Sequence, residues 1–118
     1  MTTTQTLKWE DTGIRVAWTV RRSLRWYRRH QLLNDDLTPI NIGTAGYTFA
    51  VAVYADATST TVLKSFTIIT AEYTTGYVAY EVAAADATLA VGTYYVRATI
   101  NRGTGAEPFF HGVFEVTA

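Results

Sequence analysis

Two histidines and a run of arginines are the residues in this 118-residue chain whose chemistry could build a site. His30 and His111 are the only histidines, and no H-x-x-H or H-E-x-x-H spacing is present, so a metal site would need ligands from distant segments. The chain has no cysteine, which excludes disulfides, thiolate zinc sites and a thiol nucleophile. We therefore expect both histidines to be structural, and we expect no metal, no other cofactor and no enzymatic activity.

Three further short motifs fit turns better than chemistry. Asn34–Asp36 offers oxygen ligands for calcium, but the remainder of the twelve-residue calcium loop is missing. Gly103–Gly105 lies in an expected hairpin loop rather than between a strand and a helix, so it is no phosphate-binding loop. No G-x-S-x-G nucleophile motif occurs. These motifs give no reason to expect a small-molecule ligand.

The densest charge lies in the stretch "RRSLRWYRRH", residues 21–30. Its alternation as a strand places Arg25 and Arg29 on one face and Arg28 on the other, which divides the positive charge. Arginine and tryptophan are enriched at interface hot spots. Three interpretations stay open: a protein–protein surface, a nucleic-acid grip, or a solvated strand face. The candidate interface residues are Arg21, Arg22, Arg25, Trp26, Arg28 and Arg29.

The charge is distributed unevenly along the chain although the net charge is zero. Residues 1–30 carry seven basic and two acidic side chains, a net charge of +5, and residues 31–118 carry three basic and eight acidic ones, a net charge of −5. A dedicated nucleic-acid binder is expected to be basic overall, so nucleic acid is the less favoured partner. Opposite charges favour head-to-tail contacts between copies of the chain, so we favour an assembly surface.

The elements that would carry these residues are mostly strands, because apolar residues recur with period two. With the basic stretch, seven strands are expected, the others at residues 14–20, 47–54, 62–69, 77–82, 93–100 and 109–116. Their inward residues include Trp18, Val51, Phe66, Tyr80, Val96 and Phe114. Turn-forming residues separate the runs. One domain of an antiparallel immunoglobulin-like β-sandwich, all-β with a short helical turn near residues 84–92, is predicted for residues 13–118.

The order of elements resembles the immunoglobulin-like domain of phage baseplate upper proteins and related small tail proteins. The resemblance runs from Arg21 to Val116. Its clearest part is "TTGYVAYEVAAADATLAVGTYYVRATINRGTGAEPFFHGVFEV", with a glycine before a strand, a helical turn containing Asp and Leu, Gly-x-Tyr opening the next strand, a glycine hairpin and a final Gly-x-Phe-x-Val strand. The matched positions serve turns and core: Gly76, Leu89, Gly92, Tyr94, Gly112 and Phe114.

This resemblance implies a structural part of a tailed-phage particle, a connector or adaptor in the tail, baseplate or neck. Its partners would be other virion proteins and copies of itself, with assembly in the host bacterial cytoplasm. Residues 1–20 have no counterpart in the pattern, and we expect residues 1–12 to form an arm that lies on a neighbouring subunit by strand addition. No basic region followed by an apolar run begins the sequence, so no signal peptide is expected, and no run approaches the roughly 20 apolar residues of a membrane helix.

A carbohydrate or host-surface binding module is the alternative. The chain has eight tyrosines. Four of them, Tyr54, Tyr73, Tyr77 and Tyr95, are candidates for an exposed platform on which a glycan could bind.

Overall fold

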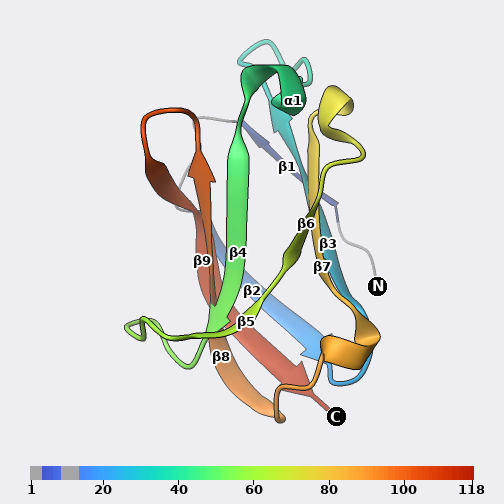
Figure 1. The fold of residues 1–118 in the computed structure, drawn as a ribbon, viewed down its shortest axis with the longest axis vertical. Helices are drawn as coiled ribbons and strands as arrows, with labels where there is room; N and C mark the ends of the chain where they lie inside the picture. The colour runs from blue at the N-terminus through green and yellow to red at the C-terminus, as the bar shows by residue number, and fades with distance from the viewer. Residues whose placement is uncertain (1–3, 9–13) are drawn as a thin grey trace.

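The chain folds into two β-sheets packed face to face, in a computed structural model that describes residues 4–8 and 14–118 (Figure 1). The four-stranded sheet has the order β1 (Thr4–Lys8), β3 (Trp26–Leu33), β7 (Tyr77–Val82), β6 (Thr67–Ile69). The five-stranded sheet has the order β2 (Ile14–Arg21), β9 (Ala106–Thr117), β8 (Gly92–Asn101), β4 (Thr48–Tyr54), β5 (Val62–Ser65). The prediction of an all-β, immunoglobulin-like sandwich is confirmed.

The described residues form more strands than the seven expected. The run from Val62 to Ile69 is two strands, because β5 pairs with β4 in one sheet and β6 pairs with β7 in the other. Phe66 lies at the crossing with 7% of its surface exposed, so its side chain fills the core while the chain changes sheets. The other added strand is β1.

β1 pairs with β3 of the same chain, at the edge of the four-stranded sheet. Strand addition by the N-terminal segment is thus seen within one chain. The expectation that residues 1–12 lie on a neighbouring subunit concerns an assembly and stays a prediction. Residues 1–3 and 9–13 lie outside the described part of the chain.

Two of the strand pairs are parallel, which departs from the predicted antiparallel sandwich. β1 runs parallel to β3, and β2 runs parallel to β9 with Val16 opposite Gly112. The pairs within the rest of both sheets are antiparallel. Alternating apolar residues indicate a strand and its buried face, but they do not indicate the neighbouring strand or its direction, so this feature lay beyond the sequence pattern.

Three short helical segments complete the fold. The 3₁₀ turn η2 (Ala84–Asp86) lies inside the stretch where a helical turn was predicted. Two others were not expected: α1 (Ile42–Ala45) and η1 (Tyr73–Thr75). The side chain of Asn41 caps α1 by accepting a hydrogen bond of 3.1 Å from Thr44 N, which satisfies a free backbone donor.

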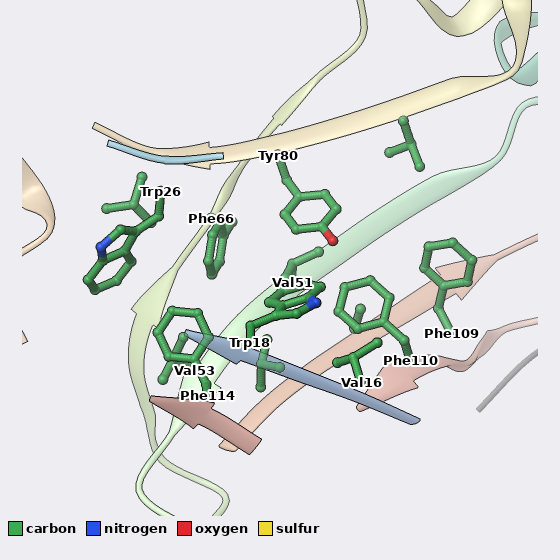
Figure 2. Close-up of a cluster of buried hydrophobic side chains, with 14 of the residues drawn as sticks. Val16, Trp18, Trp26, Val51, Val53, Phe66, Tyr80, Phe109, Phe110 and Phe114 are labelled. Carbon is green, nitrogen blue, oxygen red and sulfur yellow. The ribbon is translucent and has the colours of Figure 1, made fainter. Parts of the chain in front are cut away.

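Aromatic side chains from both sheets fill the space between them. Figure 2 shows Trp18 of β2 beside both Tyr80 of β7 and Phe110 of β9, with ring centroids 5.8 Å and 5.0 Å away. The inward faces predicted from period two are confirmed for Val51, Val96 and Phe114 among others. Phe109, next to Phe110, is also inward, beside an irregularity in the β8–β9 register.

Candidate functional site

A turn interrupts the arginine stretch that alternation had suggested was one strand. β2 ends at Arg21 and β3 begins at Trp26, so residues 22–25 connect the two sheets. Backbone hydrogen bonds hold this turn: Arg22 N donates to Thr117 O at 2.8 Å, and Ser23 N donates to Ala87 O at 2.9 Å. The turn is therefore fixed against both the C-terminal strand and the segment that follows η2.

Trp26 belongs to the core, which corrects its assignment as an interface residue. Only 2% of its surface is exposed, and its ring packs edge-on against Phe114 at 5.3 Å. The indole Nε1 donates a 2.9 Å hydrogen bond to Arg21 O, so the polar edge of the ring holds the end of β2. Trp26 therefore holds Arg21 in position and is almost entirely covered by the core.

A pocket opens between the end of β2 and the beginning of β3. Its volume is about 130 Å³. Its walls come from both strands and from the turn: Thr19, Val20, Arg21, Leu24, Arg25, Trp26, Tyr27 and Arg28. Four of the six predicted interface residues, three of them arginines, thus line one concave, partly apolar surface, which we call the arginine pocket. Arg22 lies on the same turn but is not part of the lining, and Arg29 lies further along β3.

The outward arginines of the cluster are paired within the chain. Arg25 forms a salt bridge with Glu81 and lies 4.3 Å from the ring centre of Tyr27. Arg29 bonds Glu72 at 3.0 Å and stacks over Tyr77 at 4.2 Å. Because these pairs are partly exposed, each contributes no more than about 1 kcal/mol to stability. Their main effect is to orient the guanidinium groups on the outer face of the four-stranded sheet.

Arg28 points to the inner side of β3, opposite Tyr80 in the strand register. Its guanidinium lies 5.1 Å from the ring centre of Trp18, within the range of a cation–π contact. Burial lowers the pKa of Arg28, and interaction with Tyr80 opposes that shift. Arg28 and Arg29 therefore lie on opposite faces of the strand, as alternation predicted.

His30 and Tyr80 form a hydrogen bond in the core beside Arg28, between His30 Nε2 and the Tyr80 hydroxyl. Only 2% of His30 is exposed. Burial, and secondarily the charge of Arg28, lowers the pKa of His30 to about 3, so the ring is neutral at physiological pH. Burial raises the pKa of Tyr80 well above its ordinary value. Both groups are therefore neutral at physiological pH and pack among aromatic rings.

The four tyrosines of the alternative hypothesis do not form one platform. Tyr54 and Tyr95 are directly opposite each other on β4 and β8. Tyr77 lies on the other sheet under Arg29, and Tyr73 packs against Phe49 with ring centres 6.2 Å apart. Only the Tyr54–Tyr95 pair remains as a candidate surface.

Polar groups surround the Tyr54–Tyr95 pair. Arg97 stacks 3.8 Å from the centre of the Tyr54 ring and donates to Ser59 O. The Tyr95 hydroxyl and His111 Nδ1 are 2.5 Å apart. A shallow cavity of about 380 Å³ adjoins them, lined by Arg97, Ala98, Thr99, Pro108, Phe110 and His111.

No group of three or more His, Cys, Asp or Glu side chains able to hold a metal ion occurs within residues 4–8 and 14–118. The Asn34–Asp36 motif is a turn: Asp36 Oδ1 accepts hydrogen bonds from the Thr38 hydroxyl at 2.6 Å and from Thr38 N at 3.1 Å. These bonds lower the pKa of Asp36. In the part of the chain that the structure describes, no helix is long and apolar enough to span a membrane.

Comparison with known proteins gives no family assignment. No protein-family model matches the sequence, and no curated protein matches it. Among solved structures, the chain is similar to the cysteine protease inhibitor EhICP2 from Entamoeba histolytica, with 17% sequence identity, a TM-score of 0.37, and coverage of 98% of this chain and 96% of that one. A likeness this weak carries no argument about function.

Proposed function

We propose that this chain is a structural, non-enzymatic component of a tailed-phage virion, a connector or adaptor in the tail, baseplate or neck. The resemblance of Arg21–Val116 to immunoglobulin-like phage tail domains supports a role as part of a tailed-phage virion. The arginine pocket supports the mode of action, protein–protein assembly. This pocket is the observation that carries the proposal. It gathers Arg21, Arg25 and Arg28 around one concave surface beside a turn that backbone hydrogen bonds hold in place.

A sandwich of this kind acts by geometry. Its rigid core fixes the direction in which the arginine pocket faces, and guanidinium groups bind carboxylates with defined geometry. The partners are other virion proteins and further copies of the chain. Nucleic acid is not favoured, since the net charge of the chain is zero and Arg28 lies on the inner side of β3.

The test is peptide mass spectrometry on purified phage particles whose heads and tails have been separated on a gradient. The chain should occur in the tail fraction at a fixed stoichiometry. Occurrence with heads alone would move the site of action to the neck or capsid surface, and absence from particles would overturn the proposal.

The alternative, a carbohydrate or host-surface binding module, is favoured by one observation, the Tyr54–Tyr95 pair beside a shallow cavity. Both tyrosines are half-buried, and aromatic rings with hydrogen-bonding neighbours suit the apolar face of a sugar. A glycan screen separates the two functions. Binding that is lost in Tyr54→Ala and kept in Tyr77→Ala would support the alternative.

A further inference from the structure

The loop that follows β3 is a rigid projection, which we call the knob loop (residues 34–38). Asn34 N donates to Thr38 O at 2.8 Å, and Leu37 N donates to Asn34 O at 2.9 Å. Asp36 Oδ1 accepts from Thr38 N, which closes a second small turn. A loop with this many internal bonds keeps its shape when a partner binds, so little conformational entropy is lost.

Leu37 follows the two central residues of the turn, Asp35 and Asp36, and has two unusual properties. Its φ angle is +69°, a region that costs a non-glycine residue about 1–2 kcal/mol. Its side chain is 64% exposed, the largest value among the exposed large hydrophobic side chains of the described residues. A strained backbone that presents an apolar side chain to solvent is typical of a position maintained for binding.

The knob loop and the arginine pocket lie at opposite ends of the molecule. β3 joins them, since the pocket includes its first residue, Trp26, and the loop follows its last, Leu33. Figure 1 shows the loop at the top beside α1 and the β2–β3 turn at the bottom near the C-terminus. The molecule extends 41 Å along its longest axis. A contact between two such ends is heterologous, so each copy uses both surfaces and the copies form a ring or a filament.

The two surfaces are complementary in chemistry. In the knob loop, the carboxylates of Asp35 and Asp36 directly precede the apolar side chain of Leu37. The pocket carries guanidinium groups around an apolar wall to which Leu24, itself 53% exposed, contributes. A cavity of about 150 Å³ is large enough for benzene, so a pocket of about 130 Å³ has room for a leucine side chain.

We infer that the knob loop of one copy binds the arginine pocket of the next, with Leu37 in the pocket beside Leu24 and the adjacent carboxylates on Arg21 and Arg25. This inference rests on the proposed function and names the partner as a second copy of this chain. Asp36 contributes charge and also shapes its own loop, whereas the Asp35 side chain makes no hydrogen bond or ion pair within the described residues and is the better position for mutation.

Sedimentation velocity on the purified full chain tests the contact, from micromolar concentrations up to about 1 mM, the Kd range of weak specific contacts. Two charge reversals probe the two surfaces: Asp35→Arg in the knob loop, and Arg21→Glu with Arg25→Glu in the pocket. Each should weaken self-association at least about tenfold, because like charges then face each other. An equimolar mixture of the two variants should recover association, because the reversed loop fits the reversed pocket.

A charge reversal away from both surfaces serves as the control: Arg15→Glu, on the exposed face of β2 opposite His111. This variant should associate like the unaltered chain. A chain that stays monomeric at every concentration, reversals that have no effect, or a mixture that fails to recover association would each overturn the inference.

Leu37→Gly separates binding from folding. Glycine adopts a φ of +69° without strain, so the loop and the fold should be retained or slightly stabilised, while the apolar side chain of Leu37 is lost. Self-association should fall at least about tenfold, since the removed contact is the centre of the interface. Unchanged association would overturn the inference. Particle content is measured separately: a chain that self-associates but is absent from virions overturns the proposed function and leaves this contact intact.

Discussion

Gly112 of β9 lies against the backbone of Val16 of β2, so close that a Cβ at position 112 would be 1.6 Å from Val16 O. The two residues are register partners in the parallel pair that adds β2 to the five-stranded sheet. Only glycine permits this approach. The attachment of β2, and with it the position of Arg21 at the arginine pocket, depends on the absence of one methyl group.

Gly112→Ala should therefore destabilise the domain by about 3 kcal/mol or more, because the clash is with backbone and cannot be relieved by a rotamer change. Gly43→Ala is the matched control: its added Cβ would be 3.7 Å from the nearest atom, within helix α1, where alanine is favoured. Urea unfolding followed by tryptophan fluorescence measures both. Equal midpoints for the two variants would contradict the close approach of β2 and β9.

Stability should fall as the pH is lowered from about 6.5 towards 3 because of His30. Its pKa is about 3 in the folded chain and about 6.5 when unfolded. Between these values the unfolded state binds a proton that the folded state does not, so the free energy of unfolding decreases by up to about 1.4 kcal/mol per pH unit. Asp36 and Asp56 add to the loss only below about pH 4, because hydrogen bonds from Thr38 and Thr58 lower their pKa.

The measurement is the urea midpoint between pH 4.5 and 6.5 for three proteins. His30→Phe should flatten the slope seen in the unaltered chain, whatever its absolute stability. Tyr80→Phe should keep the slope, because burial, rather than the hydrogen bond to the tyrosine hydroxyl, is the main cause of the shift at His30. A slope unaffected by His30→Phe would show that another group controls acid unfolding.

Much of the core could be predicted from the sequence, because period two is a local signal. Trp18, Val51 and Tyr80 are inward as predicted, since each alternates with polar or small neighbours. The division of 62–69 between two sheets could not be predicted. The side chain of Phe66 would point to the core from either sheet. The sequence pattern is therefore the same whether the chain stays in one sheet or crosses to the other at Phe66. Strand partners and directions are likewise set by contacts far apart in sequence.

The candidate site shows the same limit. Alternation correctly separated Arg28 from Arg29, but it could not show that the face carrying Trp26 is the core face, because both faces carry arginine. The sequence pattern did not predict the arginine pocket. Its one sequence signal is Ser23, a turn-forming residue within "RRSLR", and the structure places it in a turn with a φ of +67°.

Trp26→Phe distinguishes a core role from an interface role. The smaller ring leaves a cavity and loses the hydrogen bond from Nε1 to Arg21 O, so stability should fall by about 1–3 kcal/mol. Incorporation into particles, expressed per folded chain, should change little, because only 2% of Trp26 is exposed where it lines the arginine pocket. If the variant kept its stability but was no longer incorporated, Trp26 would have an interface role and not a core role.

Arg25→Glu with Arg29→Glu should abolish incorporation into particles while the domain stays folded. Both arginines are paired on the outer face, with Glu81 and Glu72, and partly exposed pairs of this kind contribute at most about 1 kcal/mol each. Thermal unfolding monitors the fold, and quantitative mass spectrometry of particles monitors incorporation. Reversal of both charges places carboxylates where a partner's carboxylates would bind, so the loss should exceed that in Arg25→Gln with Arg29→Gln. Incorporation unaffected by the double reversal would leave these two arginines as a solvated strand face.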